Sequence, residues 1–151
     1  MTKRIFFFSG LMVVFLLGIP GIRAVNAGCN VRSDDQYVDG CSGPWLPNVH
    51  VSGLDIDLKK LFRPACDNHD RCYHSCGCTK DECDNAFKNQ MDDICERNYP
   101  YNPVTIMGHN VGDKNAVHRA ACHLAADMFY DAVRAGGQSS YDADQHRAGC
   151  K

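Results

Sequence analysis

Residues 66–73 read Cys-Asp-Asn-His-Asp-Arg-Cys-Tyr, and this segment constrains the chain more than any other. On a helix, His69 and Tyr73 are four residues apart and Asp70 and Tyr73 are three apart, so the three side chains share one surface. The cysteines of the segment offer crosslinks that would hold this surface in place, and a second Cys-Asp pair follows at residues 83–84. A histidine and carboxylates held in this way are typical of a hydrolytic site.

The residues around this segment predict a pair of helices. The first is expected from about Leu58 to Ser75, and Pro64 would open its regular part, since proline is well tolerated in a first turn. The second is expected from Thr79 to about Arg97. Thr79 and Glu82 have the spacing of a capping box, in which the two side chains satisfy each other's backbone N–H groups. The short connection between the helices favours antiparallel packing.

The rest of the chain is expected to add a third helix and loops but no strands. The helix would run from about Asn115 to Ala135 and end at the glycines 136–137. Its apolar residues recur at helical spacing and are expected to face the core: Val117, Ala121, Leu124, Met128 and Ala132. Residues 101–113 indicate an exposed loop, and the polar tail from Gln138 would be held only through Cys150. The sequence therefore predicts an all-α, mostly helical protein.

The N-terminal residues have the pattern of an export signal. A basic stretch at 1–4 precedes an apolar run over 5–19, which is shorter than a membrane-spanning helix needs, and small residues follow up to Ala27. We expect a signal peptide over residues 1–27 and a single domain over residues 28–151. The mature protein would then be secreted and extracellular.

All 10 cysteines lie after Ala27, and this even count in a small exported chain predicts disulfides. A zinc site at Cys76-Gly77-Cys78 with His74 is the alternative, and an oxidising compartment disfavours it. The histidine pairs 69/74 and 118/123 are too far apart around a helix to form a chelate, and most of these histidines are expected to be solvated.

The charge of the mature chain excludes some partners. Removal of Lys3, Arg4 and Arg23 leaves 13 of the 16 basic residues against 18 acidic ones, so the net charge is about −5. This charge argues against nucleic acid as a partner and against strong attraction to anionic membranes.

A carboxylate of the second helix could orient the histidine of the first. Antiparallel packing could bring Asp84 against His69, and a carboxylate that accepts from one imidazole nitrogen fixes the tautomer and leaves the other nitrogen as a base. Asp70 would then be free to bind a hard cation together with backbone oxygens. Alternatively, Asp84 could be a first-turn acid that stabilises the helix dipole.

These motifs resemble those of secreted phospholipase A2 enzymes. Residues 66–73 look like the active-site helix signature of that family, and Cys83-Asp84 with Ala86-Phe87 resembles its second-helix motif. The segments 39–41 and 62–66 are more similar to its divergent branch, which includes short microbial and fungal enzymes and conodipine-like invertebrate toxins. The resemblance covers roughly Asp39 to Cys95. It implies two antiparallel, disulfide-linked helices and hydrolysis of the sn-2 ester of glycerophospholipids.

The resemblance also implies roles for individual residues. His69 would be the base, Asp84 would orient it, and Tyr73 would help to hold the imidazole. Asp70 would bind Ca²⁺. Residues 42–45, Ser-Gly-Pro-Trp, stand where the family has a glycine-rich calcium loop, so the further ligands are our own expectation: the Asp39 carboxylate and the Gly40 carbonyl first, then the Ser42 carbonyl. The implied disulfides join Cys41 to Cys66 and Cys72 to Cys83, while the pairing of the other six cysteines stays open.

The resemblance implies a peripheral protein at a phospholipid membrane or micelle surface, and we expect a monomer. An apolar rim around the site is one interpretation of Trp45, Leu46, Leu61 and Phe62, and burial is the other. The alternative function is a non-catalytic toxin or receptor-binding module on the same scaffold. A further alternative is a two-chain form, cut within residues 101–113 and held by a disulfide.

Overall fold

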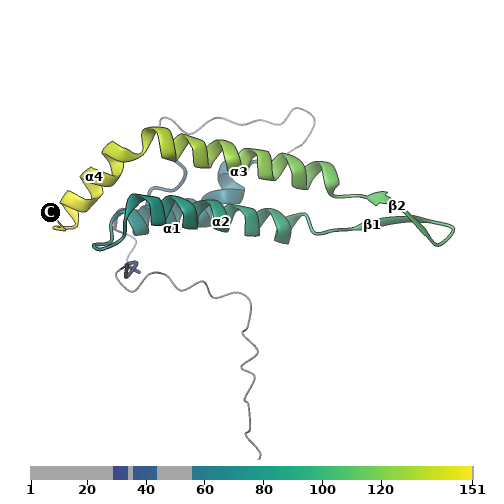
Figure 1. Cartoon of the computed structure of the whole chain (residues 1–151), viewed down its shortest axis with the longest axis horizontal. Helices are drawn as coiled ribbons and strands as arrows, with labels where there is room; N and C mark the ends of the chain where they lie inside the picture. The colour runs from purple at the N-terminus through teal and green to yellow at the C-terminus, as the bar shows by residue number, and fades with distance from the viewer. Residues whose placement is uncertain (1–28, 34–35, 44–55, 151) are drawn as a thin grey trace, which may run out of the picture.

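Four helices and one hairpin make up the part of the chain that the computed structural model describes, residues 29–33, 36–43 and 56–150. In chain order they are α1 (Leu58–Tyr73), α2 (Lys80–Asn98), β1 (Pro103–Ile106), β2 (His109–Asp113), α3 (Ala116–Gly136) and α4 (Gln138–Arg147). The long helices lie side by side, with the hairpin at one end and α4 at the other (Figure 1). Among the described residues, no helix is both long and apolar enough to span a bilayer. The predicted fold class, mostly helical and disulfide-rich, is confirmed.

The regular part of α1 begins at Leu58, six residues before the proline that was expected to start it. The Asp57 side chain accepts a hydrogen bond of 3.0 Å from the backbone N–H of Lys60, so the cap sits ahead of Leu58. Pro64 therefore lies inside the helix, on its exposed side, and does not start its regular part. The early cap decides the start, and the prediction for Pro64 was wrong.

The helix α2 packs against α1 in the opposite direction. Thr79 and Glu82 form the predicted capping box at its start. The disulfide between Cys72 and Cys83 links the helices near the short connection, and Asn68 donates to Gln90 further from it. As the residue number falls along α1 from 72 to 68, that of its partner in α2 rises from 83 to 90, so the two helices are antiparallel.

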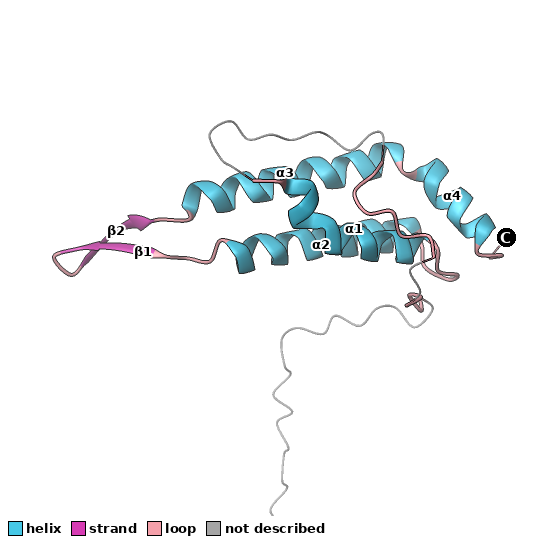
Figure 2. Cartoon of the chain, turned by 180° about the vertical axis from the view of Figure 1, so that it is seen from behind, coloured by secondary structure: helices cyan, strands magenta, loops and turns pink. Residues whose placement is uncertain are grey.

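The helix α3 covers α2, also antiparallel, and closes the core (Figures 1 and 2). The core is built from aromatic and sulfur-bearing side chains of three helices, including Phe62, Phe87, Met91 and Phe129. The core face of α3 is not the predicted stripe: Val117 is 68% exposed and Leu124 is 62% exposed. The buried face is one residue further round the helix: Cys122, Ala125, Ala126, Phe129 and Val133. This face carries the disulfide of Cys122 to Cys95 and packs in the hydrophobic core.

The predicted loop over residues 101–113 is an antiparallel hairpin, so the expectation of no strands was wrong. Met107 and Gly108 form its tip with φ of 50° and 81°, a pair of positive values that suits a two-residue hairpin turn. Met107 is 95% exposed. Arg119 of α3 contacts the carboxylate of Asp113 and so fixes the base of the hairpin.

The predicted polar tail is the helix α4. Gly137 ends α3 in an ordinary right-handed conformation, so the glycine pair bends the chain and a new helix follows at once. The buried Gln145 donates to the carbonyls of Tyr73 and Ser75, and Tyr141 donates to the carbonyl of Cys78. Two kinds of link therefore hold α4 in place: these hydrogen bonds to the end of α1 and the following turn, and the disulfide at Cys150.

All ten cysteines are paired, as the redox argument predicted. The bonds join Cys29 to Cys78, Cys41 to Cys66, Cys72 to Cys83, Cys76 to Cys150, and Cys95 to Cys122. Two of them are the pairs that the family resemblance implies. The sulfur atoms of Cys29, Cys72 and Cys78 lie close together, and each is already engaged in a disulfide.

Candidate active site

A histidine of α1 and an aspartate of α2 meet in the interior beside a cleft. The Nε2–H of His69 donates to Oδ1 of Asp84 over 2.9 Å, with the residues 7% and 0% exposed. Burial lowers the pKa of His69, although Asp84 acts in the opposite direction. Burial raises the pKa of Asp84, but hydrogen bonds from His69, Lys80 and Tyr73 outweigh it, so the pKa lies below its ordinary value. The pair is therefore a neutral imidazole beside a carboxylate.

Tyr73 completes this group from the last turn of α1. Its hydroxyl donates to the same Oδ1 of Asp84 over 2.7 Å, and burial raises its pKa. The ring of His69 is packed between aromatic rings, with centroid distances of 4.1 Å to Tyr73 and 4.7 Å to Phe87. The structure thus brings together the three residues that the sequence predicted for this group.

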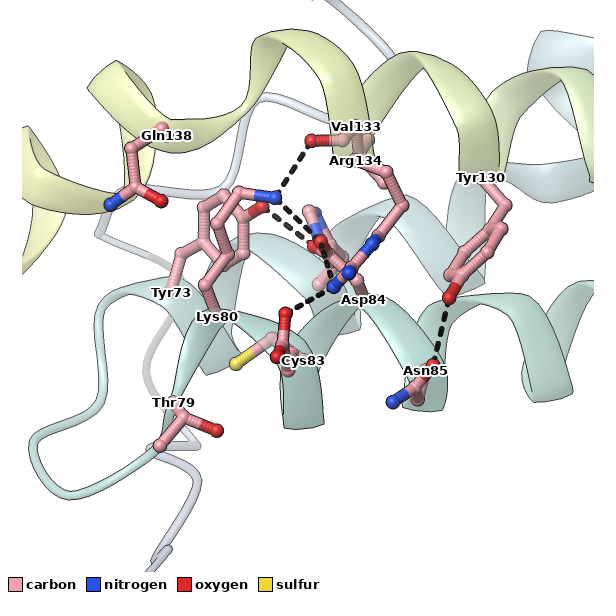
Figure 3. Close-up of polar contacts among 12 residues, drawn as sticks. Tyr73, Thr79, Lys80, Cys83, Asp84, Asn85, Tyr130, Val133, Arg134 and Gln138 are labelled. Carbon is pink, nitrogen blue, oxygen red and sulfur yellow. Dashed lines mark hydrogen bonds and ion pairs between the residues drawn. The ribbon is translucent and has the colours of Figure 1, made fainter.

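Two cations that the sequence reasoning did not single out reach the other oxygen of Asp84 (Figure 3). Lys80 of α2 donates to Oδ2 over 2.6 Å, and Arg134 of α3 lies 3.7 Å from the same atom. The i, i+4 spacing of Lys80 and Asp84 on a helix was a readable signal for the first contact. Nothing in the sequence indicated the second.

Asp70 faces the segment that was expected to form a cation loop. Its Oδ2 accepts backbone N–H groups of Asp39 and Gly40, each over 3.1 Å. Burial, together with the charge of Asp39, raises the pKa of Asp70 to about 7 against the hydrogen bonds. Gly40 has a φ of 73°, a backbone conformation that favours glycine, and the N–H of Ser42 donates back to its carbonyl.

The oxygens around this loop fit a hard cation. Asp67 lies beneath Gly40, and its Oδ1 is buried with no hydrogen-bond partner among the described residues. The carboxylates of Asp39 and Asp67 both raise the pKa of Asp70, so three acidic side chains gather here, and Arg63 lies 3.9 Å from the other oxygen of Asp67. An oxygen-only donor set of this kind suits Ca²⁺. The residues present are therefore compatible with the calcium ion that the family resemblance implies.

His69 and the proposed cation loop line one cleft of about 430 Å³. Its walls include His69 and Asp70 of α1, Asp39, Gly40 and Ser42 of the loop, and five residues of α4: Ser139, Ser140, Ala143, Asp144 and Arg147. The α4 wall was missed because its sequence is polar on all sides and has no helical stripe.

Other predicted positions lie elsewhere. Phe62 is fully buried and Leu61 is packed against the core, so neither forms an exposed rim, while Trp45 and Leu46 lie outside the described residues. His74 is buried against the ring of Tyr37, contrary to the expectation of a solvated histidine.

His123 is likewise engaged: its two ring nitrogens contact Asp92 and Glu96, both over 2.8 Å. These contacts join α2 to α3, and none of the three residues lines the cleft.

Known proteins resemble this chain along most of its length. The family model described as group XII secretory phospholipase A2 precursor matches residues 27–151. Conodipine-P3 of Conus purpurascens is 33% identical over 90 residues, which cover 58% of this chain and 44% of that protein. The group XIIA secretory phospholipase A2 of Homo sapiens is 31% identical over 113 residues, which cover 75% and 51%.

The chain spans about half the length of these relatives. No solved structure matches it. The family match nevertheless extends from residue 27 to the end of the sequence and includes both the helix pair with His69 and the loop at Asp39. The chain therefore belongs to the group XII secretory phospholipase A2 family.

Proposed function

We propose that the mature chain is a calcium-dependent phospholipase A2 that hydrolyses the sn-2 ester of glycerophospholipids to a lysophospholipid and a free fatty acid. The observation that carries this proposal is the hydrogen bond of His69 to buried Asp84 in a cleft that Asp70 and Asp39 also line. A base and carboxylates suited to a hard cation then face one space. Family membership supports the same activity.

In this proposal, His69 is the general base. Because its Nε2–H donates to Asp84, Nδ1 keeps its lone pair and can accept a proton from water. Burial favours the neutral imidazole, which is the form that this step needs. The water oxygen bonds to the sn-2 carbonyl carbon, the ester C–O bond breaks, and the proton on Nδ1 passes to the departing glycerol oxygen.

Asp84 and Tyr73 act through His69. The carboxylate of Asp84 fixes the tautomer and stabilises the imidazolium that forms when Nδ1 takes the proton. The hydroxyl of Tyr73 shares Oδ1 with His69, so it restricts where that oxygen can lie. Neither residue needs to contact the lipid.

The proposed cation ligands are the carboxylates of Asp70 and Asp39 and the carbonyls of Gly40 and Ser42. When bound, Ca²⁺ supplies positive charge for the ester oxyanion and for the substrate phosphate. The backbone N–H groups of Asp39 and Gly40 orient Asp70 within this set.

We further propose that a signal peptide is cut after Ala27 and that residues 28–151 form one secreted, monomeric domain. This domain would act peripherally on phospholipid membranes or micelles. The intact mass of the exported protein tests the cleavage site, and its elution volume on size-exclusion chromatography tests the monomeric state.

Release of free fatty acid from mixed phospholipid vesicles tests the activity directly. We expect release that requires Ca²⁺ and stops with a chelator. A preparation that is folded and fully oxidised but releases no fatty acid from any headgroup class would refute the proposal. That result would favour a binding module on the same scaffold.

A further inference from the structure

The ammonium group of Lys80 lies between the Asp84 carboxylate and the backbone of α3. Its Nζ donates to Oδ2 of Asp84 over 2.6 Å and to the carbonyl of Val133 over 2.9 Å. The Lys80 side chain is 12% exposed and the Asp84 side chain is fully buried. Figure 3 shows this amine between the two helices, pointing at both acceptors. A buried ion pair of this geometry is costly to break, because one charge would be left unpaired.

The two oxygens of Asp84 have separate partners. Oδ1 accepts from His69 and Tyr73, while Oδ2 accepts from Lys80. The last torsion of an aspartate has a broad energy minimum, so contacts at one oxygen leave the plane of the carboxylate free to turn. A donor at Oδ2 removes that freedom. The direction in which Oδ1 meets His69 is then fixed from both sides.

We propose that Lys80 is a positioning residue that fixes the plane of the Asp84 carboxylate and thereby the orientation of the His69 ring. This inference deepens the proposed function and rests on it. It assigns to α3 a part in the site, because the carbonyl of Val133 holds the amine in place.

The junction of α3 and α4 supports this role. A Cβ added at Gly137 would lie 2.5 Å from the Val133 carbonyl oxygen, 2.8 Å from the Tyr73 hydroxyl and 3.4 Å from the Lys80 side chain. The absence of a side chain here lets the backbone close directly over Tyr73 and Lys80. The junction therefore confines both groups that meet Asp84 from this side.

Arg134 is less suited to the same role. It lies 3.7 Å from Oδ2 of Asp84, its side chain is 40% exposed, and it also contacts the exposed Asp81. An exposed ion pair of this kind contributes little energy, so it does little to fix the position of the Asp84 carboxylate. Lys80 is the donor within hydrogen-bond distance of Oδ2.

The same helix offers a matched control. Lys88 pairs with Asp92 at the same i, i+4 spacing and the same 2.6 Å, two turns further along α2, and it contacts no residue of the Asp84 group. Lys88 also contacts Asp127 of α3 over 3.0 Å, much as Lys80 contacts the Val133 carbonyl of α3, and its pair with Asp92 is the more exposed of the two. Lys80→Met and Lys88→Met therefore each remove one ion pair of the same spacing and length from α2, and only the first of these pairs includes Asp84. Lys80→Gln keeps a donor for Oδ2 without the charge, and Lys80→Arg keeps both.

The experiment measures kcat and KM for fatty acid release at saturating Ca²⁺, with thermal melting of each variant. We expect Lys80→Met to lower kcat by about 10- to 100-fold with little change in KM, because misplacement of a reacting group lowers kcat by such factors. Lys80→Arg should recover most of this loss, and Lys88→Met should lose less than about twofold. A loss in Lys80→Met no greater than that in Lys88→Met would overturn the proposal. If Lys80→Met does not fold, Lys80→Gln replaces it in the test. Its kcat should then lie below the values of Lys80→Arg and Lys88→Met, and a kcat equal to that of Lys88→Met would overturn the proposal.

A second readout does not depend on catalysis. The ¹⁵N resonances of the His69 ring report its tautomer and the hydrogen bond at Nε2. We expect them to move or broaden in Lys80→Met and to stay unchanged in Lys88→Met. Absence of fatty acid release by the wild type would refute the proposed function alone. Unchanged His69 resonances in a folded Lys80→Met would refute the role of Lys80, whatever the activity.

Discussion

The two ends of the helical bundle are built differently. Four of the five disulfides join segments at the end that carries α4 and the cleft: Cys29–Cys78, Cys41–Cys66, Cys72–Cys83 and Cys76–Cys150. The end that carries the hairpin has one, Cys95–Cys122, at the base of the long helices. The buried polar and charged side chains of the described residues lie at the cleft end: His69, His74, Ser75, Asp84 and Gln145. At the hairpin tip, Ile106 and Met107 are exposed. Crosslinks are concentrated where buried polar groups must keep a fixed geometry.

Replacement of the base should produce the largest effect. We expect His69→Gln to fold, bind Ca²⁺ and lose about 10²- to 10⁴-fold in activity, because the positioned general base is lost. The assay is calcium-dependent fatty acid release, with circular dichroism as the check of folding. His118→Gln, a histidine near the hairpin end that stacks on Tyr99, is the matched control and should keep its activity. Wild-type activity in His69→Gln would remove this residue from the mechanism.

Loss of the proposed cation ligand should come next. A ligand that binds only the folded state raises its thermal midpoint, so Ca²⁺ should stabilise the wild type. We expect Asp70→Asn to lose both this stabilisation and calcium-dependent activity, while the exposed Asp93→Asn of α2 keeps both. Differential scanning calorimetry with Ca²⁺ and with chelator measures the shift. An equal calcium shift in Asp70→Asn would place the cation elsewhere.

Paired disulfide removals compare the two ends directly. We expect Cys76→Ser/Cys150→Ser and Cys95→Ser/Cys122→Ser each to lower the free energy of unfolding by about 2–4 kcal/mol. Activity below the melting range should fall in the first variant, because α4 forms a wall of the cleft, and should be nearly unchanged in the second. Denaturant unfolding and initial rates at low temperature test both statements. Equal losses of activity would show that the two ends do not differ in this respect.

The smallest effect concerns pH and the hairpin end. Burial lowers the pKa of His123, but its contacts with Asp92 and Glu96 outweigh this and raise it above the ordinary 6.5. The stabilisation from His123 is therefore fully present below pH 6.5 and is lost as the pH rises through the folded-state value. The pKa of Asp92 is lowered from 3.8, because hydrogen bonds from Lys88 and His123 outweigh burial, so its stabilisation is lost only in acid.

The thermal midpoint as a function of pH measures this contribution. We expect the thermal midpoint of His123→Gln to fall less steeply than that of the wild type between neutral and alkaline pH. An unchanged slope in the variant would show that the ion pairs of His123 contribute nothing to stability.

Local features of the sequence predicted much of the helix pair. The spacing of His69, Asp70 and Tyr73, the capping box and the short connection are short-range signals, and they suffice to bring Asp84 near His69. Lys80 could have been read in the same way, since it precedes Asp84 by one helical turn.

Long-range packing decided the rest. The helix α3 carries two apolar stripes with the same period, and the buried one carries the bond of Cys122 to Cys95 and the contact of Phe129 with Phe62. The helix α4 has no apolar stripe, and the buried Gln145 and a disulfide hold it in place instead. Contacts of this kind join residues far apart in the chain, and no local pattern reports them.

The sequence separations within the site suggest an order of folding. Asp84 is 15 residues from His69 and Cys83 is 11 residues from Cys72, whereas Val133 is 53 residues from Lys80 and Cys150 is 74 residues from Cys76. Closing a longer loop costs more chain entropy, so the short loops should close first. A chain refolding from the reduced state would then bring His69 to Asp84 before the walls of the cleft exist. Its activity would return with the last bond to form, the one at Cys150.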